Sequence, residues 1–240
     1  MSLFTAKGSD VKEQINKEKV DLKEAFFRLK AENESVPVRV LGTEDYVAYK
    51  AHSDFKKGLY NTPCLAVTGQ SCPYCTASKQ GGEDWKNFYA KDRFMFAFAD
   101  LNSGQVKILE VSKNQAKKLI QQIDEYSEEI KAGEVAFNLT RTGSGTATGY
   151  SLNMITPKKM KDLQSKFDAF NDTIVDEEFF EARLVAKDIP YMLNLLEDAG
   201  LPIEKYFEAE LVAEARAEKQ KHQNNGEEVK PIDDTDEDLI

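Results

Sequence analysis

A cluster of soft metal ligands constrains this sequence more than any other feature. All three cysteines of the chain and one of its two histidines fall within residues 52–75, as His52, Cys64, Cys72 and Cys75. An odd number of cysteines argues against a closed disulfide framework, whereas three cysteines and a histidine form a standard tetrahedral zinc set. The surrounding segment is too polar and loop-rich to hold its shape unaided, and a metal would supply that folding free energy. The pattern predicts one structural Zn²⁺ ion, with no coordination position left for a catalytic water.

The same residues allow a redox interpretation. Cys72-Pro73-Tyr74-Cys75 is identical to the active-site tetrapeptide of glutaredoxins, in which a thiolate of low pKa attacks disulfides. That family requires a strand leading directly into the motif and a helix leaving it. Here Gly69-Gln70-Ser71 precedes the motif, and the thiol chemistry assigns no role to Cys64 or His52. A thiol oxidoreductase stays as an alternative to the zinc site.

The net charge of −10 is distributed unevenly along the chain. Residues 36–170 contain eighteen Lys or Arg and fifteen Asp or Glu, a net charge of +3. Residues 171–224 have a net charge of −7, and residues 225–240 have a net charge of −6. A strongly negative total argues against a nucleic-acid partner, but a basic body joined to an acidic tail does not. We therefore expect a weakly cationic binding body whose own tail competes with its ligand.

Aromatic and basic residues alternate through the segment around the cysteines. Exposed bases stack on aromatic rings and phosphates pair with Lys and Arg, so this mixture is typical of single-stranded nucleic-acid binding. The sequence predicts that the nucleic-acid-binding residues are Arg39, Tyr46, Tyr49, Lys50, Lys56, Lys57, Tyr60, Tyr74, Trp85, Lys86, Tyr89, Lys91, Arg93 and Arg141. Phe94, Phe96 and Phe98 share one face of a predicted strand and are expected in the core instead.

Hydrophobic periodicity predicts a mixture of short strands and helices. A helix is expected within residues 9–34, strands at 36–41 and 46–51, an irregular segment at 52–92, a hairpin at 93–111 and a helix at 112–130. A second hairpin is expected at 134–155, followed by broken helix from 158 to 224. The predicted class is α+β: an OB-fold-like small β-barrel core with a zinc-binding insertion, a helical C-terminal portion and a disordered acidic tail.

These elements suggest a division of the chain into four parts. They are an N-terminal segment (1–35), an OB-like DNA-binding core with its zinc subdomain at about 52–92 (36–170), a helical acidic region (171–224) and the acidic tail (225–240). No nucleophile elbow, phosphate-binding loop or HExxH motif is present, so we expect no enzymatic activity. The sequence has no apolar run that could span a membrane and begins with no secretory signal, which favours the cytoplasm.

The ligand spacing, the aromatic and basic core and the acidic tail together resemble the single-stranded-DNA-binding, helix-destabilising replication proteins of T-even-type bacteriophages. His52, Cys64, Cys72 and Cys75 follow the order of that family's zinc ligands. The resemblance implies an OB-fold that holds single-stranded DNA in a basic, aromatic cleft during replication, recombination and repair in the cytoplasm of an infected bacterial host. It also implies an acidic tail that binds replication and recombination proteins.

One departure from that family concerns the N-terminus. The family begins with a basic arm that drives cooperative binding, whereas residues 1–10 here contain only Lys7, opposed by Asp10. The sequence also allows a second class of function, a zinc-containing adaptor whose acidic tail docks on protein partners without contacting DNA. Metal content and a DNA titration would distinguish the two.

Overall fold

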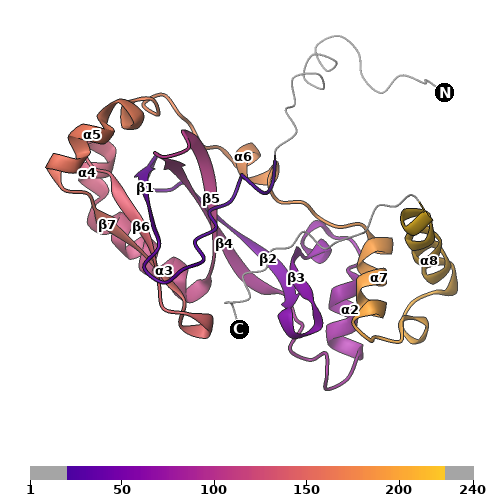
Figure 1. Cartoon of the computed structure of the whole chain (residues 1–240). Helices are drawn as coiled ribbons and strands as arrows, with labels where there is room; N and C mark the ends of the chain where they lie inside the picture. The colour runs from indigo at the N-terminus through magenta and orange to yellow at the C-terminus, as the bar shows by residue number, and fades with distance from the viewer. Residues whose placement is uncertain (1–20, 225–240) are drawn as a thin grey trace, which may run out of the picture.

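A curled antiparallel sheet organises the protein in the computed structural model, which describes residues 21–224 (Figure 1). Seven strands of the described chain form this sheet: β1 (Ser35–Val40), β2 (Tyr46–Asp54), β3 (Leu59–Pro63), β4 (Lys91–Asp100), β5 (Gln105–Ser112), β6 (Phe137–Thr142) and β7 (Gly149–Met154). The strands and the helices beside them make the protein α+β, as the sequence predicts.

The long strand β4 lies at the centre of the topology. Strand β5 pairs with one edge of β4, whereas β2 and β1 divide its other edge between them. The edge is divided near residue 97, because β2 pairs with residues 91–96 and β1 with residues 98–100. From there β3 extends the sheet beyond β2, while β6 and β7 extend it beyond β1. Two partners on one edge curl the sheet into a half-barrel.

The helices lie at the two ends of the sheet and, in one case, over its middle. They are α2 (Pro73–Gln80), α3 (Lys113–Glu125), α4 (Ser127–Ala132), α5 (Pro157–Asp168), α6 (Glu177–Glu181), α7 (Ile189–Asp198) and α8 (Ala209–Asn224), with short 3-10 turns between some of them. Figure 1 shows α3, α4 and α5 near β6 and β7, and α2, α7 and α8 beyond the end of β2 and β3. Within the described residues, no helix is long and apolar enough to cross a membrane.

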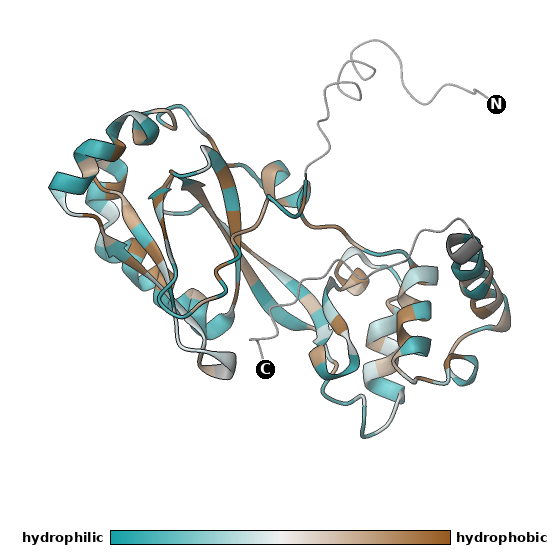
Figure 2. Cartoon of the chain, in the orientation of Figure 1, coloured by the Kyte–Doolittle hydropathy of each residue, from teal (hydrophilic) through white to brown (hydrophobic). Residues whose placement is uncertain are grey.

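The main core lies between the sheet and α3. Phe96 and Phe98 are fully buried there and Phe94 is partly buried, which confirms the prediction that this triplet is internal. Figure 2 shows hydrophobic (brown) and hydrophilic (teal) residues on the strands; residues 95–100 of β4 are buried on both faces, because Phe180 of α6 packs on the face opposite α3. The capping box that starts α3 also follows from sequence, because Ser112 and Gln115 exchange side-chain and backbone hydrogen bonds.

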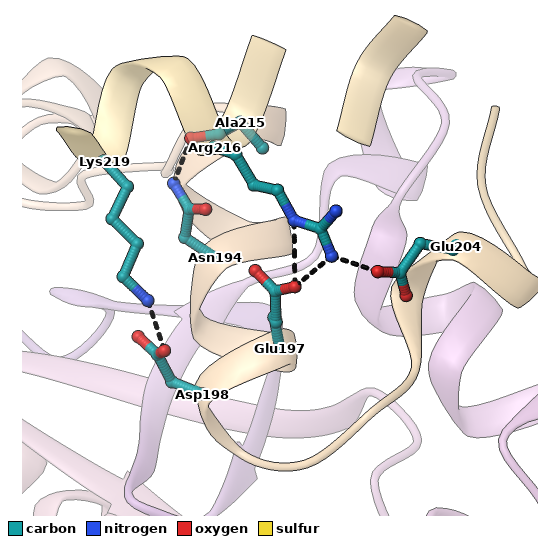
Figure 3. A network of polar contacts seen from close by, with 7 residues as sticks. All are labelled: Asn194, Glu197, Asp198, Glu204, Ala215, Arg216 and Lys219. Carbon is teal, nitrogen blue, oxygen red and sulfur yellow. Dashed lines mark hydrogen bonds and ion pairs between the residues drawn. The ribbon is translucent and has the colours of Figure 1, made fainter. Parts of the chain in front are cut away.

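A second core joins the insertion to the end of the chain. We call residues 52–92 the metal module; its buried residues share one hydrophobic cluster with Met192, Leu193, Leu196, Val212 and Ala215 of α7 and α8. Polar contacts also connect the two helices (Figure 3). Arg216 of α8 pairs with Glu197 and Glu204, and the Asn194 amide donates to the Ala215 carbonyl at 2.7 Å. The C-terminal helices therefore complete the metal module.

Three predicted elements differ from the structure. The helix expected at 9–34 is wrong for residues 21–34, which form turns and bond to β5 through Ala25 and Phe27; residues 1–20 lie outside the described chain, as does the tail at 225–240. The segment at 52–92, expected to be irregular, contains β3 and α2. The helix expected at 112–130 is two helices, because the chain breaks its regular form at Tyr126.

Candidate metal centre and cationic cleft

The four predicted metal ligands come from three consecutive elements. His52 lies in β2, Cys64 directly follows β3, and Cys72 and Cys75 stand at the start of α2. Proline fixes the backbone at two of these places, since Pro63 ends β3 and Pro73 occupies the first position of α2, where it needs no hydrogen-bond partner. The pairing of β2 with β3 then brings His52 and Cys64 to the same end of the hairpin.

The ligand atoms of His52, Cys64, Cys72 and Cys75 all lie within 4.8 Å of one another. The Sγ atoms of Cys64 and Cys75 are 3.5 Å apart, and His52 Nε2 lies 3.4 Å from Cys75 Sγ and 3.8 Å from Cys72 Sγ. A tetrahedral zinc ion with Zn–S of about 2.3 Å and Zn–N of about 2.0–2.1 Å separates its ligands by about 3.5–3.8 Å. This cluster, the metal centre, could hold a metal ion.

A shell of hydrogen bonds and aromatic rings orients His52. Its Nδ1–H donates to the carbonyl oxygen of Phe88 at 2.7 Å, which leaves Nε2 as the free ligand atom. The rings of Tyr74 and Phe88 pack against the imidazole, with centroids 5.7 and 5.3 Å from it, and Trp85 packs on Phe88. His52 is fully buried, so its hydrogen bond and its ring contacts fix one orientation.

The thiols of the metal centre differ in acidity. Burial opposes ionisation of Cys72, but its contact with the His52 ring and hydrogen bonds from the backbone N–H groups of Cys75 and Leu65 lower the pKa of the Cys72 thiol to about 6. Burial and the adjacent sulfur atoms of Cys64 and Cys72 raise the pKa of the Cys75 thiol to about 12. Three thiolates this close together require a cation between them, and a divalent metal provides that charge.

A cleft of about 710 Å³ lies between the metal module and the start of α3. We call it the cationic cleft, and its lining residues are Ser53, Asp54, Phe55, Lys56, Asn87, Tyr89, Ala90, Lys91, Asp92, Arg93, Ser112, Lys113 and Asn114. The lining therefore contains four cationic side chains and two carboxylates. Four predicted nucleic-acid-binding residues, Lys56, Tyr89, Lys91 and Arg93, are brought together there.

Tyr89 is the most exposed aromatic side chain of the cationic cleft. Its side chain is 55% exposed, and the Lys91 ammonium lies 5.2 Å from its ring centroid. Arg93 bonds to Glu110 at 2.8 Å, and Asp92 pairs with Lys50 beside the cleft at 2.8 Å. Lys50 holds the pKa of Asp92 below its usual value, so this carboxylate is neutralised by a neighbour and opposes an anionic ligand less.

Four other predicted nucleic-acid-binding residues are buried. Tyr74 and Trp85 belong to the core of the metal module, so their rings present no free face to a base. Arg39 bonds to the Phe167 carbonyl at 2.7 Å and stacks on that ring. Arg141 donates to the Lys30 carbonyl and to Thr148. In this conformation these side chains have structural partners in place of a surface role.

The remaining predicted residues lie outside the cationic cleft. Tyr46 packs on Phe96 of the main core, while Tyr49 and Tyr60 line a second, smaller pocket of about 110 Å³. The Lys57 ammonium lies 5.0 Å from the Trp85 ring, and exposed Lys86 pairs with Glu83. The alternation of aromatic and basic residues therefore splits between two faces of the sheet and the interior of the metal module.

Sequence reasoning missed several residues of the cationic cleft. They are Ser53, Asn87, Lys113 and Asn114 in particular. Lys113 could have been found from the capping signal at Ser112, which predicts that the next residues begin a helix at the end of a strand.

Comparison with known proteins returned no relative, since neither a protein-family model nor a curated protein matches the chain.

Proposed function

We propose that this chain is a non-enzymatic single-stranded-DNA-binding protein that holds DNA without sequence specificity in the cationic cleft. The observation that carries the proposal is the convergence of Lys56, Tyr89, Lys91 and Arg93 on one cleft from separate segments. An exposed ring stacks on any base, and cations around it pair with phosphates, so binding tolerates every sequence. The curled sheet supports an OB-fold, which commonly binds oligonucleotides.

The proposed metal is one structural Zn²⁺ ion. Three thiolates and an imidazole are soft ligands, and separations of 3.4, 3.5 and 3.8 Å among their ligand atoms support a closed tetrahedron. His52 and Phe88 precede Ser53 and Tyr89, so the metal would steady the backbone that forms two walls of the cationic cleft. In this proposal the ion supports the binding surface and contacts no DNA.

The biological role follows the resemblance to the T-even phage proteins. The chain would protect and extend single strands during phage DNA replication, recombination and repair in the host cytoplasm. Its net −6 tail at residues 225–240 would bind the cognate replication and recombination proteins and compete with DNA for the cationic body. The chemistry that supports this part is the separation of charge between residues 36–170 and the C-terminal segments.

A titration of labelled oligo-dT tests the proposal and the role of Tyr89. Wild-type protein should bind at low salt, with affinity falling steeply as salt rises because counterions are released. Tyr89→Ala should weaken binding by about 1–3 kcal/mol, the usual contribution of one stacked base, whereas Tyr89→Phe keeps the ring and should bind nearly as wild type. Fluorescence anisotropy of the oligonucleotide gives the affinity directly, which is necessary because Trp85 is buried.

Two experimental outcomes would favour another function over DNA binding. Zinc bound at one ion per chain without any oligo-dT binding would favour the adaptor. A metal-free protein that turns over glutathione disulfides would favour the oxidoreductase, which is supported by the low pKa of Cys72 and by helix α2, which leaves the motif. Against that chemistry, Cys72 is 4% exposed and a short 3-10 turn at Leu65–Thr68, followed by a loop, precedes its motif where a strand is required.

A further inference from the structure

The charges of α3 run against its own helix dipole. Its first turn contains Lys113 and no acid, and Lys117 and Lys118 follow in the second turn. Its last turn contains Asp124 and Glu125 and no base. A helix macrodipole favours the opposite arrangement, with acids at the N-terminus and bases at the C-terminus. The capping box of Ser112 and Gln115 stabilises this helix start. The lysines add no stability there, because cations at a helix N-terminus oppose the dipole.

The lysines of α3 continue the surface of the cationic cleft. Lys113 lines the cleft, and Lys117 lies one helical turn further along, about 6 Å along the axis. The buried face of α3 carries Gln115, Ala116, Leu119 and Ile123, whereas Lys117 and Lys118 are exposed. Across residues 21–224, no carboxylate lies within ion-pair distance of Lys117 or Lys118, whereas Lys113 acts electrostatically on Asp92 of the cleft. The charge of Lys117 and Lys118 is available to an anionic ligand.

We propose that the N-terminal half of α3 extends the DNA interface beyond the cationic cleft, with Lys113, Lys117 and Lys118 binding successive phosphates of the strand as it leaves the cleft. The proposal rests on the proposed function. A polyanion placed along this face explains both the lysines at the helix start and the lack of ion-pair partners at Lys117 and Lys118. Asp124 and Glu125 repel phosphate, so the contact ends before the last turn and the strand leaves the helix there.

The test is the double variant Lys117→Gln/Lys118→Gln, with Lys158→Gln/Lys159→Gln on α5 as its matched control. Both pairs are exposed helical lysines, neither lines the cationic cleft, and Gln and Lys have similar helix propensities. Oligo-dT of about four and about sixteen nucleotides, the range of site sizes of single OB folds, would be titrated over a salt series. Circular dichroism would check that each variant is folded.

The α3 variant should lose about tenfold or more in affinity for the longer oligonucleotide while binding the shorter one as wild type does. Its slope of log K against log[salt] should fall by about 0.7 for each lost phosphate contact. Unchanged affinity and slope, an equal loss with the α5 control, or an equal loss for both lengths would overturn the α3 interface and leave the cleft proposal standing. Absence of oligo-dT binding by wild-type protein would overturn both.

Discussion

The two ring nitrogens of His52 connect the metal centre to the cationic cleft. Nε2 faces the sulfur atoms of Cys72 and Cys75, and Nδ1 bonds to the Phe88 carbonyl. The residues that follow His52 and Phe88 in the chain form two walls of the cleft. One buried side chain therefore links two segments of the cationic cleft to the metal centre.

Asp100 is a second buried polar residue with a definable role, because it closes the hairpin between β4 and β5. Its carboxylate accepts hydrogen bonds from Ser103 Oγ at 2.8 Å and Asn102 N–H at 2.9 Å, and pairs with Lys107 at 2.9 Å. Burial alone would raise the pKa of Asp100, but the bonds from Lys107, Ser103 and Asn102 lower it overall. A carboxylate with a depressed pKa stabilises the folded state wherever it is ionised.

Asp100→Asn should therefore destabilise the protein near neutral pH by about 1–3 kcal/mol, the usual cost of losing hydrogen bonds to a charged group. The stabilisation by Asp100 is complete above the unfolded carboxyl pKa of about 3.9 and is lost as pH falls through the lower folded pKa. The difference from wild type in urea unfolding should shrink correspondingly under acid conditions. At about pH 2, roughly two units below the unfolded pKa, Asp100 should contribute little. A difference in unfolding free energy between wild type and Asp100→Asn that stays constant down to that pH would contradict this account.

Residue identity grouped the four ligands of the metal centre, but it did not separate exposed aromatic residues from buried ones. Soft ligands at close spacing have few other uses, so His52, Cys64, Cys72 and Cys75 could be grouped without knowing the fold. A tyrosine or tryptophan packs in a core as readily as it stacks on a base. The chain therefore could not distinguish Tyr89, which is exposed, from Tyr74 and Trp85, which fill the metal module.

At the scale of elements, the metal module has little secondary structure to hold it together. Strand β3 and helix α2 are short, and a metal bound at about 1,000 times its Kd stabilises a fold by about 4 kcal/mol. Cys72→Ser should therefore lose the metal and lower the melting temperature. Trp85, the single tryptophan, is 4% exposed in this module. If loss of the metal opens the module in Cys72→Ser, water reaches the indole and its emission should shift to longer wavelength.

Ser71→Ala serves as the control for Cys72→Ser, since Ser71 is the exposed neighbour and ligates nothing in the metal centre. Metal analysis, thermal unfolding and tryptophan emission are measured on both variants. Chelation of the wild-type protein should reproduce the Cys72→Ser spectrum. A Cys72→Ser protein that retains the wild-type melting temperature and emission would remove the metal from any structural role.

Local pattern predicted the elements of the sheet better than those of the module. Alternating apolar residues and turn glycines marked both hairpins, and their strands differ from prediction by only a few residues at each end. Helix α2 was missed because eight residues between a proline and a glycine show too few turns for a clear period. The packing of α7 and α8 on the metal module depends on contacts between residues far apart in the chain, which local periodicity does not encode.

At the scale of the whole molecule, the proposed competition between the acidic tail and DNA can be tested by removing the tail. Removing residues 225–240 takes away a net charge of −6, so the shortened chain should bind oligo-dT more tightly at low salt. The gain should disappear as salt rises, because screening weakens the competition. Anisotropy titrations of the two chains over a salt series measure this.

A full-length variant with the tail acids replaced by Asn and Gln is the control for chain length. It should bind as tightly as the shortened chain, since charge and not bulk is the proposed competitor. Equal low-salt affinities for the wild-type, neutralised and shortened chains would show that the tail does not compete with DNA. The net charge of the whole protein would then carry no information about the cleft.

The shared cluster of the metal module, α7 and α8 imposes an order of assembly during synthesis. All four candidate ligands have been translated by residue 75. The two helices that cover their module, α7 and α8, lie much later in the chain, within residues 189–224. A chain still attached to the ribosome could bind the proposed metal early, but the apolar side of the module stays in water until α7 and α8 have been synthesised. A chain truncated before α7 would contain every candidate ligand and still expose the apolar surface that α7 and α8 normally bury. We expect such a chain to aggregate or to be bound by chaperones.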